Sequence, residues 1–137
     1  MDKKDERKCV DSSNNNIPAD ILIVDDVYAN VFLIENMLSE YYCVASVDSA
    51  NEMRRYLMHS KPKLILLDLM MPFEDGFSIL ERLAANEDLA KIPVIVVSAR
   101  DSREDVLKAM RLGAADYVVK PVEETVLLAK IAKILGE

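Results

Sequence analysis

The sequence predicts a doubly wound α/β fold built on a five-stranded parallel sheet, and two features of its apolar pattern predict it. From residue 20 onward, short and purely apolar runs are typical of strands buried on both faces. Longer amphipathic segments separate these runs, and their apolar residues recur at helical spacing. Five such pairs follow one another, so the predicted element order is (βα)₅.

The expected strands are short and consist mostly of β-branched or aliphatic residues. They are Ile21–Val24, Cys43–Val47, Leu64–Leu67, Val94–Val97 and Tyr117–Val119. The helices between them are indicated by apolar residues at steps of three and four, such as Val27, Val31, Ile34 and Leu38. Val106, Ala109 and Met110 indicate the fourth helix, which Gly113 ends. Right-handed crossovers put helices on both faces of the sheet, which favours the flavodoxin-like strand order 2-1-3-4-5.

Length and composition indicate one soluble domain. The chain has 137 residues, of which 51% are hydrophobic and 30% charged, and its apolar runs are too short to span a bilayer. We therefore expect no membrane partner. No apolar signal segment follows Met1, and Cys9 and Cys43 are the only cysteines, so a disulfide framework is not expected. This fits a cytoplasmic location.

The acidity of the chain belongs to its folded part. The net charge is −7, and residues 1–19 carry equal numbers of basic and acidic side chains, so the whole excess lies in residues 20–137. An acidic domain argues against direct binding of nucleic acid, which requires a basic face. Residues 1–19 lack an apolar period and are predicted to form a flexible polar tail before a domain at 20–137.

Chemically reactive residues follow four of the five strands. Asp25 and Asp26 follow the first strand, Asp68 the third, Ser98 the fourth and Lys120 the fifth. Taken singly, each has a structural explanation as a turn former, a helix cap or a surface ion pair. The carboxyl ends of parallel strands meet at one edge, however, where crowded carboxylates repel one another unless a cation intervenes. Mg²⁺ suits such oxygen ligands, and together the residues supply the parts for phosphoryl transfer.

Four motifs carry a resemblance to a known family. They are Ile21–Asp26, Leu67–Pro72 with Asp75-Gly76, Val97–Ala99 and Gly113–Pro121. Over residues 20–136, this ordered set resembles the receiver domains of two-component response regulators. The resemblance implies a phosphoacceptor switch.

The family's functional residues transfer to this sequence one by one. The resemblance implies that Asp68 is the phosphoacceptor and that Asp25 and Asp26 bind Mg²⁺ with it, while the backbone carbonyl of Met70 completes the protein ligands.

The same resemblance assigns Ser98 and Lys120 to catalysis beside Asp68. Ser98 would bond a phosphoryl oxygen, and Lys120 would pair with the acceptor carboxylate, with a cis peptide bond to Pro121. Tyr117 resembles the switch aromatic, and Ser98 takes part in the switch with it.

The implied phosphodonor is a phosphohistidine on a sensor histidine kinase or a histidine phosphotransfer protein. Phosphorylation would change the face made by the fourth helix, fifth strand and fifth helix, through which a homodimer or a downstream effector could bind. The chemistry would be self-phosphorylation and autodephosphorylation, not enzymatic turnover. We expect no output domain within the 137 residues. A stand-alone regulator and a fragment of a larger multidomain regulator or hybrid kinase both stay open.

Three rival functions were weighed. A phosphohydrolase with an aspartate nucleophile needs a second acid two residues later, where Met70 stands. A flavodoxin-like electron carrier needs a Ser/Thr-rich phosphate loop after the first strand, and residues 27–30 do not supply one. A pseudo-receiver that only binds partners is opposed by the complete acidic set, and phosphorylation of Asp68 would distinguish it.

Overall fold

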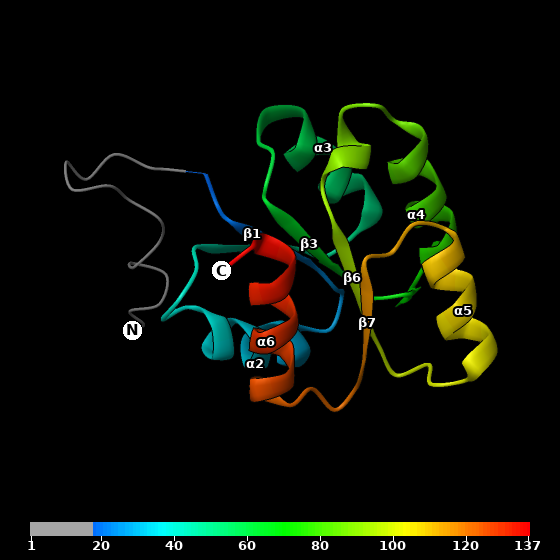
Figure 1. The fold of residues 1–137 in the computed structure, drawn as a ribbon. Helices are drawn as coiled ribbons and strands as arrows, with labels where there is room; N and C mark the ends of the chain where they lie inside the picture. The colour runs from blue at the N-terminus through cyan, green and yellow to red at the C-terminus, as the bar shows by residue number, and fades with distance from the viewer. Residues whose placement is uncertain (1–17) are drawn as a thin grey trace.

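A five-stranded parallel sheet forms the middle layer of the computed structural model, which describes residues 18–137 (Figure 1). The strands lie in the order β2-β1-β3-β6-β7, which confirms the predicted order 2-1-3-4-5 when these five strands are counted along the chain. Of the predicted tail, residues 1–17 lie outside the described residues. Ala19, two residues before the start of β1, is already buried.

The five sheet strands and five α-helices alternate along the chain, as predicted. The strands are β1 (Ile21–Val24), β2 (Val44–Val47), β3 (Leu64–Leu67), β6 (Val94–Ser98) and β7 (Asp116–Val119). The helices are α2 (Tyr28–Leu38), α3 (Ala50–His59), α4 (Gly76–Ala85), α5 (Arg103–Arg111) and α6 (Glu124–Leu135).

Three strand boundaries differ from the prediction by one residue. β2 begins at Val44, which pairs with the first residue of β1, and not at Cys43. β7 begins one residue earlier than predicted, at Asp116. β6 includes Ser98, which pairs with Val119. Backbone pairing does not depend on an apolar side chain, so an apolar pattern alone misses polar residues at strand ends.

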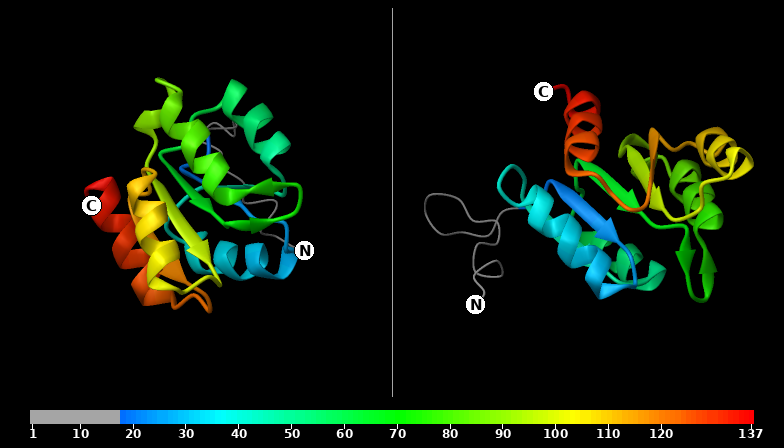
Figure 2. Two further views of the ribbon diagram at one scale, coloured as in Figure 1. Left: turned by 90° about the vertical axis from the view of Figure 1, so that its right-hand side faces the viewer. Right: turned by 90° about the horizontal axis from the view of Figure 1, so that it is seen from below.

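Alternate residues of the strands serve two separate cores, one on each face of the sheet. Leu22 and Val24 of β1 point into the core beneath α3, α4 and α5, whereas Ile21 and Ile23 point into the core beneath α2 and α6. Figures 1 and 2 show these helices on opposite sides of the sheet. Because both faces of the sheet are covered, the central strands are almost entirely apolar. Polar residues with a function are therefore expected at the ends of these strands.

Two short elements were not predicted. A two-stranded antiparallel hairpin, β4 (Met70–Met71) and β5 (Glu74–Asp75), follows β3, and a 3₁₀ helix, η1 (Leu89–Lys91), follows α4. Elements of two or three residues are too short to show an apolar period. The right-hand view of Figure 2 shows the hairpin, in green, projecting away from the sheet.

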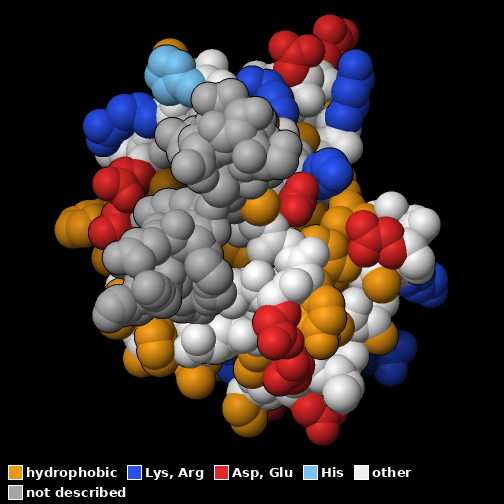
Figure 3. All heavy atoms as spheres, turned by 90° about the vertical axis from the view of Figure 1, so that its left-hand side faces the viewer, with side chains coloured by type: hydrophobic (Ala, Val, Ile, Leu, Met, Phe, Trp, Pro, Cys, Tyr) orange, Lys and Arg blue, Asp and Glu red, His pale blue; other side chains and the backbone are white. Residues whose placement is uncertain are grey.

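The surface of residues 18–137 matches the mixed composition of the chain. Within these residues, no helix has both the length and the apolar character needed to cross a membrane. On the face drawn in Figure 3, acidic, basic and apolar side chains lie among one another.

The first residue of α4 is a glycine because there is no space for a side chain at this position. A Cβ at Gly76 would lie 2.4 Å from the Cα of Leu69 and 3.0 Å from its carbonyl oxygen, both of which are backbone atoms that cannot rotate away. We expect Gly76→Ala to lower the free energy of unfolding by about 3 kcal/mol, the upper end for over-packed sites. Urea denaturation measures this change.

Gly136→Ala is the matched control, because Gly136 has φ +79 but no atom lies within 4 Å of the position that a Cβ would occupy. Its cost should be limited to that of a left-handed residue, about 1 kcal/mol. Equal losses in the two variants would contradict the close-approach explanation.

Candidate functional site

The polar residues predicted at the strand ends do meet at one edge of the sheet. Asp25 follows β1, Asp68 follows β3, Ser98 ends β6 and Lys120 follows β7. Asp25, Asp68 and Ser98 are the three buried polar residues among residues 18–137. Burial of polar groups requires partners, so the hydrogen bonds of these residues define the site.

Lys120 joins two of the buried carboxylates. Its Nζ lies 3.0 Å from Oδ2 of Asp25 and 3.0 Å from Oδ2 of Asp68. Burial lowers the pKa of the Lys120 ammonium, but the hydrogen bonds to Asp25 and Asp68 and their charges outweigh burial, so that its pKa is raised overall. Lys120 therefore stays charged and offsets charge that would otherwise make burial of both acids unfavourable.

The second oxygen of each buried carboxylate accepts a local backbone hydrogen bond. Oδ1 of Asp25 accepts from the N–H of Val27 at 2.9 Å, and Oδ1 of Asp68 accepts from the N–H of Met70 at 3.0 Å. These bonds between residues two apart fix the carboxylates relative to the loops that leave β1 and β3. Strand ends and local turns together orient both acids before any ligand binds.

A third acid completes a cluster that could hold a metal ion. Asp26 is exposed, and one carboxylate oxygen each from Asp25, Asp26 and Asp68 lies within 4.8 Å of the others. Three carboxylates facing one ammonium leave an excess of two negative charges, which a divalent cation would neutralise. The all-oxygen donor set suits Mg²⁺, so the residues present fit the predicted metal.

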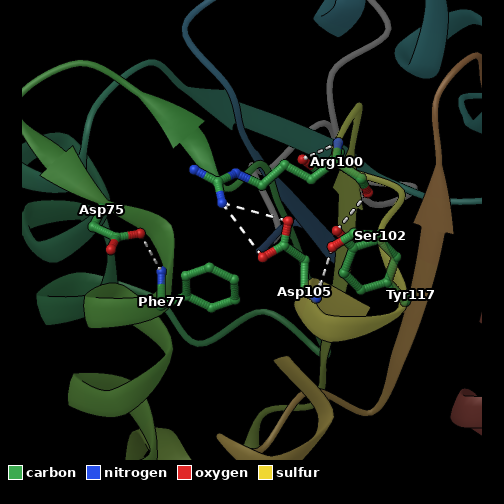
Figure 4. A network of polar contacts seen from close by, with 7 residues as sticks. Asp75, Phe77, Arg100, Ser102, Asp105 and Tyr117 are labelled. Atoms are coloured by element: carbon green, nitrogen blue, oxygen red, sulfur yellow. Dashed lines mark hydrogen bonds and ion pairs between the residues drawn. The ribbon is translucent and has the colours of Figure 1, made fainter. Parts of the chain in front are cut away.

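Ser98, Tyr117 and Arg100 form a second group of contacts, and Figure 4 shows Arg100 and Tyr117 of this group. The Ser98 Oγ accepts a hydrogen bond from the N–H of Arg100 at 3.2 Å, and the Tyr117 hydroxyl donates to the carbonyl of Arg100 at 2.7 Å. Burial raises the pKa of the Tyr117 phenol; a hydrogen bond with Ser98 opposes the shift but does not cancel it. The Tyr117 ring is buried, so the phenol is tied to the loop that follows β6.

The loop after β6 is also tied to the start of α4. The Arg100 guanidinium lies 5.6 Å from the centre of the Phe77 ring, and the Lys108 ammonium of α5 lies 4.4 Å from it. Arg100 Nη1 also contacts Asp105 on α5 at 3.5 Å. These cation–π contacts and the ion pair connect α4 with the loop and helix next to Ser98.

The structure places every residue predicted for the site, with two additions. Lys120 contacts Asp25 as well as the predicted Asp68, and the partner of the Tyr117 hydroxyl is a backbone carbonyl, which no side-chain pattern reveals. The predicted cis peptide bond between Lys120 and Pro121 is confirmed. The carbonyl of Met70 as a metal ligand stays a prediction, and its side chain is exposed.

Fold and site together define a class of α/β protein whose buried acids, hydroxyl and amine gather at the carboxyl edge of a doubly wound sheet. Residues 21–132 match the response regulator receiver domain family. The chain therefore belongs to this family, as its motifs indicated.

Named relatives and solved structures agree with this assignment. The chain is 36% identical over 117 residues to the response regulator PleD of Caulobacter vibrioides, covering 85% of this chain and 26% of PleD. It is 33% identical to protein PilH of Pseudomonas aeruginosa, covering 86% of this chain and 98% of PilH. The receiver domain of a histidine kinase from Syntrophus aciditrophicus superimposes with a TM-score of 0.78 at 31% identity, covering 86% and 90% of the two chains.

The acidic cluster predicts that Mg²⁺ stabilises the fold. Metal that binds only the folded chain should raise the free energy of unfolding by about 2.7 kcal/mol at 100 times its dissociation constant. Asp26→Asn should remove most of this gain and stabilise the metal-free chain, because one repelling charge is lost. Thermal unfolding with Mg²⁺ or with EDTA measures both effects.

Asp88→Asn is the control, since Asp88 is an exposed acid outside this cluster. It should respond to Mg²⁺ as the wild type does. A wild-type response in Asp26→Asn would exclude Asp26 as a ligand.

Proposed function

We propose that the chain is a phosphoacceptor switch in two-component signalling, in which Asp68 receives a phosphoryl group in a Mg²⁺-dependent reaction. The observation that carries the proposal is the placement of Asp68. This acid is buried, lies 3.0 Å from the Lys120 ammonium, and shares a possible cation site with Asp25 and Asp26. An ordinary structural aspartate needs neither a shared ammonium nor two neighbouring acids.

The proposed donor is a phosphohistidine of a sensor histidine kinase or a histidine phosphotransfer protein. A carboxylate oxygen of Asp68 bonds to phosphorus while the phosphorus–nitrogen bond breaks, and the imidazole keeps the electron pair and takes up a proton. Mg²⁺ held by Asp25, Asp26 and Asp68 would supply positive charge that offsets the negative charge of the phosphoryl group. The Lys120 ammonium offsets the negative charge that develops on the phosphoryl group, and the Ser98 hydroxyl donates a hydrogen bond to a phosphoryl oxygen.

Water attack on the resulting acyl phosphate restores the Asp68 carboxylate and releases inorganic phosphate. This is modification and resetting of the chain itself and not turnover of a separate substrate. Met70 and Arg100 flank the site and are both substantially exposed, so they are the side chains that can control access of that water.

The proposed switch runs from Ser98 to α5. A Ser98 hydroxyl drawn towards a phosphoryl group changes its contacts with Tyr117 and with the N–H of Arg100, which lies in the loop leading into α5. The buried Tyr117 ring corresponds to the inward position that we assign to the active state. Phosphorylation shifts the population only by its differential interaction with the two states.

The face made by α5, β7 and α6 is the proposed output surface. It carries four large apolar side chains that are at least 40% exposed, Leu107, Met110, Val119 and Val126. A homodimer or a downstream effector could cover them. Since the chain spans 26% of PleD but 98% of PilH, its relatives include both longer proteins and proteins of its own length.

The acceptor assignment predicts that acetyl phosphate with Mg²⁺ adds one phosphoryl group to the wild type and none to Asp68→Asn. Asp68 alone combines a central position with a buried carboxylate next to Lys120. Intact-mass spectrometry measures the product. The control is Asp48→Asn, which removes an exposed acid after β2 and should be labelled normally. Normal labelling of Asp68→Asn would refute the assignment, and an unlabelled wild type would favour the pseudo-receiver.

The switch predicts that beryllofluoride, a phosphoryl mimic, shifts the amide resonances of residues 106–111 and 116–119 in the wild type. Ser98→Ala should reduce these shifts, because it removes the hydroxyl that links the site to Tyr117. Amide NMR spectra measure both. Wild-type shifts confined to the loops around Asp68 would contradict the switch while leaving the phosphorylation chemistry intact.

A further inference from the structure

Phe73 lies at the tip of the β4–β5 hairpin. Its backbone conformation and the exposure of its apolar side chain are both unfavourable in the folded state. Its φ is +70, a left-handed conformation that is uncommon for a bulky residue. Its side chain is fully exposed, at 106% of the reference area, so the ring buries no apolar surface within residues 18–137. A glycine would satisfy this turn at lower cost.

The surrounding contacts hold Phe73 in this conformation. Met70 pairs with Asp75 and Met71 with Glu74 across the hairpin. The Glu74 carboxylate contacts Arg54 of α3 at 3.5 Å and also contacts Arg82 of α4.

The end of the hairpin is secured in the same way. The Asp75 carboxylate accepts a hydrogen bond from the N–H of Phe77 at 3.0 Å, which caps α4 (Figure 4). Strained residues persist where their surroundings over-determine them, and they gather at functional sites. The exposed ring of Phe73 is therefore presented from a firmly anchored turn.

The hairpin begins at the candidate phosphorylation site. The N–H of Met70, its first residue, donates to the Asp68 carboxylate. Phe73 is five residues beyond Asp68, so their Cα atoms are at most about 18 Å apart. The Met70 side chain, 53% exposed, adds a second apolar group between them. A protein that presents a phosphohistidine to Asp68 must cover this edge and comes within reach of the hairpin.

We propose that Phe73 is an apolar anchor that inserts into the protein phosphodonor when the donor presents its phosphohistidine to Asp68. The inference rests on the proposed function and names a contact that selects the partner. The matching surface of the donor is an apolar depression near its histidine. A rigid aromatic ring loses little conformational entropy on binding, which suits an anchor.

The anchor is tested by comparing a protein donor with a small one. The candidate donors are the histidine kinase transmitter domains and histidine phosphotransfer domains encoded in the source genome. Each is first phosphorylated on its histidine, and the one that transfers fastest to the wild-type chain is used as the probe. Its kcat/KM is measured for wild type, Phe73→Gly, Phe73→Leu and Tyr41→Ser. Tyr41 is an aromatic control, 59% exposed and placed after the C-terminal end of α2, at the opposite edge of the sheet. Labelling by acetyl phosphate is measured in parallel.

Phe73→Gly should lower kcat/KM for the protein donor by about thirty-fold, the effect of losing one hot-spot side chain, mainly through a higher KM. Labelling by acetyl phosphate should change less than about twofold, and the melting temperature should rise because the left-handed strain is relieved. Phe73→Leu, which keeps an apolar side chain, should lose less than Phe73→Gly. Tyr41→Ser should match the wild type.

Wild-type transfer to Phe73→Gly would overturn the anchor, as would the absence of any protein donor faster than equimolar acetyl phosphate. A wild-type dimer that Phe73→Gly abolishes without slowing transfer would assign the ring to a second copy and also overturn it. Failure of the proposed function has a different signature, namely no labelling of wild-type Asp68 by acetyl phosphate.

Discussion

Three carboxylates converge at the carboxyl edge of the sheet, and the ammonium of Lys120 lets two of them lie buried there. Without it, the carboxylates of Asp25 and Asp68 would repel each other in a region of low solvent access. The ammonium does not balance all three acids. The remaining negative charge makes the edge receptive to a divalent cation, because the two ion pairs of Lys120 permit burial of Asp25 and Asp68 without neutralising the whole cluster.

The sheet supplies the rigidity that this arrangement needs. Its central strands β1, β3 and β6 are covered on both faces, and polar residues occur only at their ends. Residues at those ends are held by backbone pairing on one side and by loops on the other. The loops after β3 and β6 are in turn tied to helices, through Asp75 at the start of α4 and through Arg100 against Phe77. Contacts thereby connect the site at this edge to α4.

The hairpin after β3 shows how the same edge combines stability with recognition. Glu74 ties it to α3 and α4, and this attachment holds Phe73 in a conformation that the chain alone disfavours. The cost of an exposed ring on strained backbone is intelligible if the ring meets a partner. The short segment after β3 would then carry both the acceptor, Asp68, and the residue that contacts the donor, Phe73. The contact that selects the donor would lie close to the acceptor.

The sequence alone determined the layer order, the sheet topology and nearly every side chain of the site, because apolar period and strand-end position are local properties of the chain. Asp25, Asp26, Asp68, Ser98 and Lys120 could be placed together since parallel strands must end at a common edge. The family motifs added roles that spacing by itself does not assign.

The tertiary structure alone decided which side chains and backbone groups of separate elements come into contact. The contact of Lys120 with Asp25 requires a long side chain to reach from β7 past β6 and β3 to β1. The bond from Tyr117 to the carbonyl of Arg100 and the stacking of Arg100 and Lys108 on Phe77 involve backbone atoms or ring faces, which leave no trace in a residue pattern. The β4–β5 hairpin was equally invisible, because its strands are too short to have a period and the left-handed turn at Phe73 is imposed by contacts of its neighbours.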